Sequence, residues 1–235
     1  MSNRNIAVER ISLPSATLET PDVYLLIGDN RSSLRDMAEE LSELSGLYWS
    51  RSYRNELALV ATWKRKVGID IEFLGTEFTS EEPLFDLTAV FDQDNDRTLE
   101  WSAISGAEKP IASSALLFSE QNETTLADII LTEEENTYLS SFPDEDKISQ
   151  LLKIWSAKEA LTKALGDALS YNPKFLTSPV MWPESKSGRW HYVSFDPVES
   201  ISQIMSKDNH SISKPILDNL TISGQYIASL VYEVI

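Results

Sequence analysis

Two short segments of the chain carry polar residues at spacings that could do chemistry. The first is Gly68-Ile69-Asp70-Ile71-Glu72, within an otherwise apolar run. Successive side chains of a β-strand point to opposite faces, so Asp70 and Glu72 would share one face. Two carboxylates this close repel each other and are costly to bury unless a cation lies between them. The segment therefore predicts either a pair of metal ligands or a strand with one solvated face.

The second segment is WSAKEALTK, residues 155–163. In an α-helix, Trp155, Glu159 and Lys163 are four residues apart and share a face, while Lys158 lies on its flank. Taken alone, this pattern is typical of a core tryptophan beside an ordinary Glu–Lys helix pair. Its occurrence after the first segment in the same chain is what favours a functional site.

Strands and helices must position these segments. Apolar runs predict strands at 5–13, 23–28, 57–63, 67–74, 189–195 and 220–235. The short cationic stretch 64–66 between two of these runs predicts a β-hairpin from 57 to 74. Helical patterns occur at 31–47, 131–142 and 146–166.

Local signals mark the ends of the predicted helices. Thr132 followed by Glu135 fits a capping box, and Gly46 and Gly166 are natural C-terminal stops. Strands and helices alternate without the regular βαβ rhythm of a parallel sheet. The expected fold class is therefore α+β.

Composition excludes several kinds of site. The 235 residues include no cysteine and only two histidines, His191 and His210. Disulfides, thiolate metal sites and multi-histidine zinc sites are therefore excluded, and oxygen ligands favour a hard ion such as Mg²⁺. No apolar run is long enough to span a membrane, and the N-terminus lacks the apolar core of a secretory signal. We expect a cytoplasmic protein that does not bind membranes.

The net charge of −17 is concentrated in one region. Residues 75–150 hold 18 acidic and three basic residues, a net charge of −15. Duplex nucleic acid is an unsuitable partner for this chain, because binding it needs a concentrated basic surface. The acidic region is interpreted as a solvated insertion, with a docking surface for a basic partner as the alternative.

Together, the GIDIE strand and the W-S-x-K-E-A-x-x-K helix resemble the 4′-phosphopantetheinyl transferases, and among them the larger, monomeric branch built of two halves. Residues 131–139 resemble the segment that precedes this helix in the family. Residues 49–52, followed by LALVATW, resemble the family's S-H-S stretch and the strand that follows it. The resemblance covers residues 47–74 and 128–170.

The resemblance implies an α+β fold of two similar halves, related by a pseudo-two-fold, with the active cleft between them. Residues 1–127 would form the first half, including the acidic insertion at about 75–125. Residues 128–235 would form the second half. The interval from Asp70 to Glu159 is longer than is usual in the family, and the excess falls in the acidic stretch.

The activity implied by the resemblance is that of a holo-carrier-protein synthase. Such an enzyme transfers the 4′-phosphopantetheine arm of coenzyme A to a serine of an apo acyl or peptidyl carrier protein, with Mg²⁺, and releases 3′,5′-ADP. The metal ligands would be Asp70, Glu72 and Glu159. Lys158 and Lys163 would contact phosphate, and Glu159 would be the general base.

Coenzyme A would also be bound by residues that flank these motifs, namely Ser50, Arg51, Arg31 and Arg35. Arg51 stands where the family has the histidine of S-H-S. An arginine can still bind phosphate but cannot act as a base. Arg31 and Arg35 share a helix face, where they could reach a phosphate together or be ordinary solvated charges. The alternative to an enzyme is a non-catalytic or substrate-restricted relative that acts as a protein-interaction module.

Overall fold

The structure is a computed structural model, and it describes residues 6–13, 19–28, 30–75, 126–166, 172–199 and 225–234. The chain divides into two compact units, residues 1–76 with 131–235, and residues 77–130. The second unit is described only over α4 (Leu126–Ile130). Nearly all of the acidic insertion expected at about 75–125 lies outside the described residues.

The first sheet of the larger unit is antiparallel, with the strand order β1-β2-β4-β3. Its strands are β1 (Ile6–Ile11), β2 (Asp22–Gly28), β3 (Tyr48–Arg54) and β4 (Leu57–Trp63). Helix α1 (Arg31–Ser45) connects β2 to β3. As the sequence predicts, α1 ends at Gly46, which adopts the left-handed conformation at φ 60°.

The second sheet is also antiparallel, with the order β5-β8-β7-β6. Its strands are β5 (Val67–Gly75), β6 (Lys186–Ser187), β7 (Trp190–Phe195) and β8 (Gln225–Glu233). Between β5 and β6 lie α5 (Glu133–Ser140) and α6 (Asp144–Leu165). The capping box of Thr132 and Glu135 starts α5, and Gly166 ends α6, as expected. None of the described helices is long and apolar enough to cross a lipid bilayer.

The hairpin expected from residues 57–74 is wrong. β4 pairs with β2 and β3, whereas β5 pairs with β8 in the other sheet. The true hairpin joins β3 to β4 through Asn55, which adopts a positive φ of 52°. Asparagine tolerates that conformation, whereas the cationic stretch 64–66 offers none of the residues that tight hairpin turns require.

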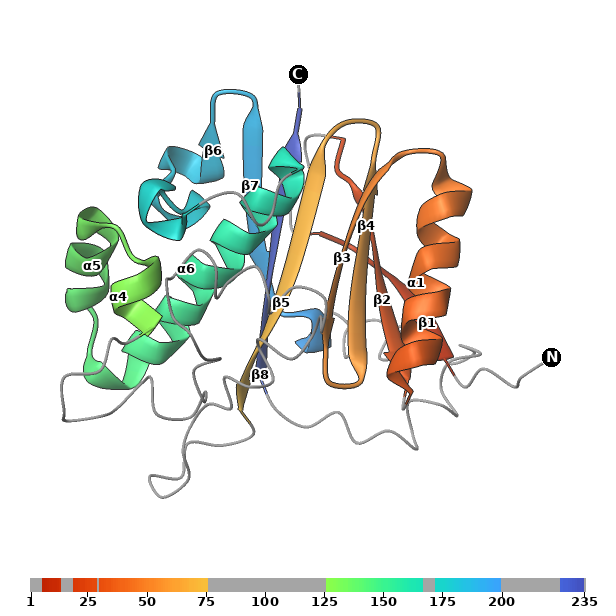
Figure 1. Cartoon of the computed structure of the whole chain (residues 1–235), viewed down its shortest axis with the longest axis horizontal. Helices are drawn as coiled ribbons and strands as arrows, with labels where there is room; N and C mark the ends of the chain where they lie inside the picture. The colour runs from red at the N-terminus through yellow and green to blue at the C-terminus, as the bar shows by residue number, and fades with distance from the viewer. Residues whose placement is uncertain are drawn as a thin grey trace, which may run out of the picture. The chain divides into compact units, whose positions relative to one another are not determined.

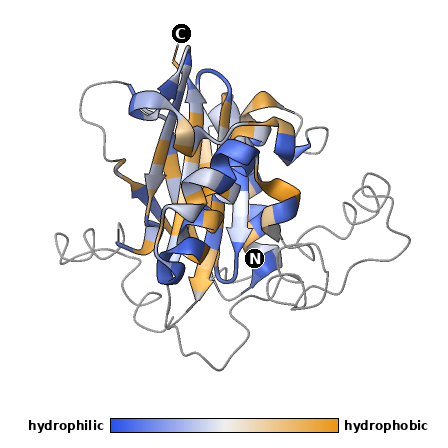
Figure 2. Cartoon of the chain, turned by 90° about the vertical axis from the view of Figure 1, so that its left-hand side faces the viewer, coloured by the Kyte–Doolittle hydropathy of each residue, from blue (hydrophilic) through white to orange (hydrophobic). Residues whose placement is uncertain are grey.

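The two sheets pack face to face around one apolar core. Side chains such as Leu25 and Leu59 of the first sheet meet Ile69 and Leu230 of the second. Helix α1 covers the outer face of the first sheet, and α6 covers that of the second (Figure 1). Figure 2 shows the chain from the side of α5 and α6, where the helices carry both hydrophilic and hydrophobic residues.

Both sheets share one order of elements. In the first, β2, α1, β3 and β4 follow one another, and β4 lies between β2 and β3. In the second, β5, α6, β7 and β8 occur in the same order, with α4 and α5 before α6 and β6 before β7, and β8 lies between β5 and β7. In each sheet the last of these three strands therefore lies between the other two, and a helix follows the first strand in the sequence.

Candidate functional site

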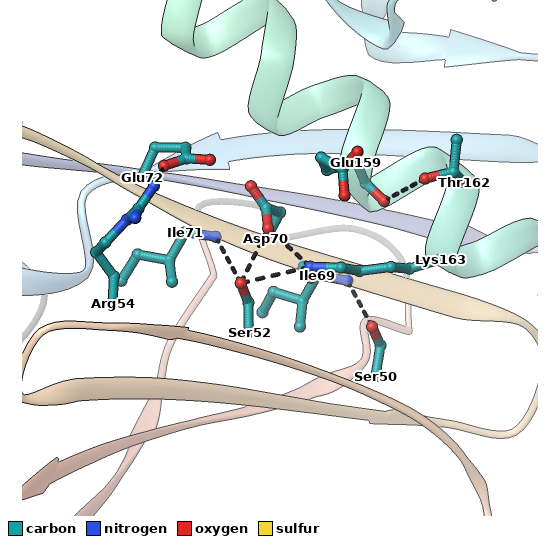
Figure 3. Close-up of polar contacts among 10 residues, drawn as sticks. All are labelled: Ser50, Ser52, Arg54, Ile69, Asp70, Ile71, Glu72, Glu159, Thr162 and Lys163. Carbon is teal, nitrogen blue, oxygen red and sulfur yellow. Dashed lines mark hydrogen bonds and ion pairs between the residues drawn. The ribbon is translucent and has the colours of Figure 1, made fainter. Parts of the chain in front are cut away.

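The GIDIE segment lies on β5, an edge strand of the second sheet, next to β3, an edge strand of the first. The hydroxyl oxygens of Ser50 and Ser52 accept hydrogen bonds from the backbone N–H groups of Ile69 and Ile71, at 3.0 and 3.3 Å (Figure 3). The two strands therefore run parallel here and are joined by side chains instead of a backbone ladder. We call this junction the β3–β5 seam. At this seam the serine hydroxyls satisfy backbone N–H groups on the edge of β5 that have no strand of their own sheet beside them to bond to.

The face of β5 that carries Asp70 and Glu72 points toward α6. Gly68 lies on the same face, where an added Cβ would come within 1.8 Å of the Ala160 carbonyl oxygen of α6. The two carboxylates lie beneath this helix, and Asp70 and Glu72 are only 5% and 4% exposed. The alternative of a solvated strand face is therefore wrong.

Asp70 is bound through one of its two oxygens. Its Oδ1 accepts from Lys163 Nζ of α6 at 2.7 Å and from the Ser52 hydroxyl at 2.9 Å. Its Oδ2 is buried and has no hydrogen-bond partner among the described residues. Asp70 can thus offer one buried carboxylate oxygen to a further ligand without breaking an existing bond.

Glu72 is bound by a cation that the sequence analysis missed. Arg54 of β3 forms an ion pair with Glu72 across the β3–β5 seam, and both side chains are buried. Burial lowers the pKa of Arg54, the charge of Asp70 raises it, and that of Arg31 lowers it. A signal was available, because Ser50, Ser52 and Arg54 are polar residues at every second position of β3.

Glu159 is half-buried on α6, one turn before Lys163. In Figure 3, Asp70 lies between Glu72 and Glu159. The structure thus brings all three expected carboxylates to the junction of β5 and α6. However, no three acidic or histidine side chains in the described part of the chain are grouped closely enough to hold one metal ion as they stand. The observation that fits a hard metal ion is the partnerless buried oxygen of Asp70.

Lys158 lies elsewhere. Its side chain is 1% exposed, and its Nζ lies 2.6 Å from Glu135 of α5 and 2.8 Å from the carbonyl oxygen of Pro173. Burial lowers the pKa of Lys158, and Glu135 raises it. This interior position does not support the phosphate contact expected of Lys158. Glu135 also accepts from the backbone N–H groups of Thr132 and Ser178, so it joins α5, α6 and the segment after α6.

The arginines expected to bind coenzyme A lie on the other side of β3. The Arg51 guanidinium stacks over Trp49 at 4.4 Å from the ring centroid, and that of Arg35 lies 6.0 Å from the Tyr53 ring. Arg31 is the exposed first residue of α1. The hydroxyl of Ser50, in contrast, is already engaged in the β3–β5 seam.

Comparison with known proteins supports one family. No curated protein matches the chain. Residues 113–213, however, match the family described as the 4′-phosphopantetheinyl transferase superfamily. Glu159 and Lys163 lie inside the matched residues, and Asp70 and Glu72 precede them. At the level of the superfamily, the expected resemblance is confirmed: residues 113–213 carry a domain of the 4′-phosphopantetheinyl transferase superfamily.

Proposed function

We propose that the chain is a Mg²⁺-dependent holo-carrier-protein synthase. It would transfer the 4′-phosphopantetheine arm of coenzyme A to a serine of an apo acyl or peptidyl carrier protein and release 3′,5′-ADP. One observation carries the proposal beyond the family match. Lys163 of the WSAKEALTK helix lies 2.7 Å from Asp70 of the GIDIE strand, although they are 93 residues apart in the chain.

We also propose that the two sheets are the two similar halves of the larger, monomeric branch of the family. The shared order of strand, helix, strand and strand, with the last strand central, supports a pseudo-two-fold relationship. Strand pairing favours a boundary at the connection 64–66 over one at residue 127, because β5 pairs within the second sheet. The active cleft would then lie along the β3–β5 seam.

In this reaction the serine oxygen attacks the β-phosphorus of coenzyme A, and negative charge builds on the departing phosphate. A bound Mg²⁺ would neutralise that charge, held by Asp70 and Glu159. Lys163 would contact the phosphate, and Glu159 would accept the serine proton. Glu72, the third carboxylate of the expected set, is already paired with Arg54.

The cations on the α1 side of β3 would hold the nucleotide end of coenzyme A. Arg31 and Arg35 are exposed on α1, and Arg51 is half-exposed on β3. Guanidinium groups bind phosphate oxygens in bidentate fashion, so three of them on α1 and β3 suit an anionic cosubstrate. We therefore assign Arg51 to phosphate binding and not to proton transfer.

The alternative, a non-catalytic relative that acts as an interaction module, is favoured by one observation. Asp70 and Glu72 are both paired with cations of the chain itself. In that case the two ion pairs would serve the fold alone, and no metal would be needed.

A transfer assay separates these two functions. The protein is mixed with coenzyme A, Mg²⁺ and a panel of apo carrier proteins, and the mass of each carrier is measured. A gain of one phosphopantetheine arm, lost on adding a chelator, is the expected result. A carrier whose acceptor serine is replaced by alanine is the matched control. No gain with any carrier, together with no binding of coenzyme A, would favour the interaction module.

A further inference from the structure

The two carboxylates beneath α6 are held in different ways. Lys163, the partner of Asp70, is 19% exposed and comes from the covering helix. Arg54, the partner of Glu72, is 6% exposed and comes from the neighbouring edge strand. Lys163 can therefore move toward solvent, whereas Arg54 is enclosed between the two sheets.

Coordination of a metal by Glu72 would compete with this buried ion pair. A guanidinium that loses its counter-charge inside the protein is strongly destabilised, since the interior does not replace the lost water. Asp70 carries less of this cost, because its cation, Lys163, is 19% exposed and can be solvated by water. The geometry thus separates one carboxylate whose cation reaches solvent from one whose cation is buried.

We propose that Glu72 is the structural counter-ion of Arg54, and that it does not coordinate the metal. This inference rests on the proposed function in one respect, namely that a divalent ion binds at Asp70 and Glu159. Arg54 is then a positioning residue. By holding Glu72, it fixes β5 against β3 and keeps Asp70, two residues away on the same strand face, in place beneath α6.

The test measures metal affinity directly. Mn²⁺ is titrated into the full chain in the presence of coenzyme A, and free Mn²⁺ is followed by electron paramagnetic resonance. We expect Asp70→Asn to weaken Mn²⁺ binding by more than about 100-fold, beyond the cost of losing a residue that only supports a metal site. Glu72→Gln should weaken it by no more than about 10- to 100-fold, the range for a residue that positions a ligand without touching the ion. Weakening by Glu72→Gln as large as that by Asp70→Asn would overturn the proposal.

A second variant keeps the test valid if Glu72→Gln folds poorly. Arg54→Met/Glu72→Met replaces the whole pair by apolar side chains, which is often tolerated at buried ion pairs. We expect this double variant to fold and to retain Mn²⁺ binding. A folded double variant with affinity as weak as that of Asp70→Asn would assign Glu72 to the metal.

Unfolding experiments on the same residues test the Arg54–Glu72 ion pair independently of metal binding. A double-mutant cycle over Arg54→Met and Glu72→Met should show strong coupling, because either single change leaves one buried charge behind. Additive effects would overturn the proposed pairing. A wild-type protein that binds no Mn²⁺, even with coenzyme A, would count against the proposed function, while strong coupling would still support the role of Glu72 as a counter-ion.

Discussion

Lys163 of α6 donates to Asp70 Oδ1 of β5 at 2.7 Å, and the same ammonium group contacts Ser52 Oγ of β3 at 3.4 Å. One cation therefore links the second sheet, the edge of the first sheet and the helix that covers the site. Because Ser52 also donates to Asp70, the carboxylate is oriented from two directions (Figure 3). This arrangement gives Lys163 a role in placing Asp70 as well as in binding phosphate.

Lys163→Met should reduce transfer by about 100-fold, the usual cost of losing one group that stabilises transition-state charge. Lys163→Arg should retain part of the activity, because it keeps a cation near Asp70. The measurement is kcat and KM for coenzyme A with the carrier at saturation. Lys147→Met is the matched control, since Lys147 lies on the same helix and its ion pair with Asp144 is at the surface. Unchanged kinetics in Lys163→Met would remove this lysine from the mechanism.

Glu159→Gln tests the proposed general base. We expect turnover to fall by about 10²- to 10⁴-fold, the range for loss of a general base. The amide keeps the size of the side chain, and Glu159 is only half-buried, so the melting temperature should change little. Glu145→Gln, in the exposed first turn of the same helix, is the control. Retained turnover in Glu159→Gln would show that another group takes the proton.

Much of the local structure could be predicted from the sequence, because its signals are local. The ends of α1 and α6 follow from Gly46 and Gly166, and the start of α5 follows from the capping box of Thr132 and Glu135. The alternation of Asp70 and Glu72 along β5 places both on one face, as expected.

Pairing across long stretches of chain could not be predicted in the same way. The assignment of β5 to the second sheet depends on β8, which lies some 150 residues later in the sequence than β5. The partners of Lys158 and Glu72 are likewise set by which strand or helix packs beside them. The sequence does not show which counter-ion a charged side chain will meet. The family resemblance therefore gave Lys158 a role at the phosphate that its burial does not support.

Lys158→Met should act on stability more than on cosubstrate binding. It leaves Glu135 charged and buried without its cation, a change that costs about 3–5 kcal/mol at such pairs. The measurement is the free energy of unfolding in urea, together with KM for coenzyme A. Lys158→Met/Glu135→Gln should recover part of the loss, since the amide is neutral and can still cap α5. A large rise in KM with unchanged stability would instead restore the phosphate role of Lys158.

Gly68→Ala tests how closely α6 must lie on β5. The added methyl group would meet backbone atoms, 1.8 Å from the Ala160 oxygen and 2.5 Å from the Ala164 nitrogen, so the helix itself must shift. Overpacking of this kind costs about 1–3 kcal/mol or more. Because Glu159 and Lys163 move with the helix, we expect kcat to fall as well. Gly188→Ala is the matched control: its Cβ meets nothing within 4 Å, and only its positive φ of 57° is strained. It should lose stability alone, and an equal loss of kcat in both variants would mean that the position of α6 does not govern turnover.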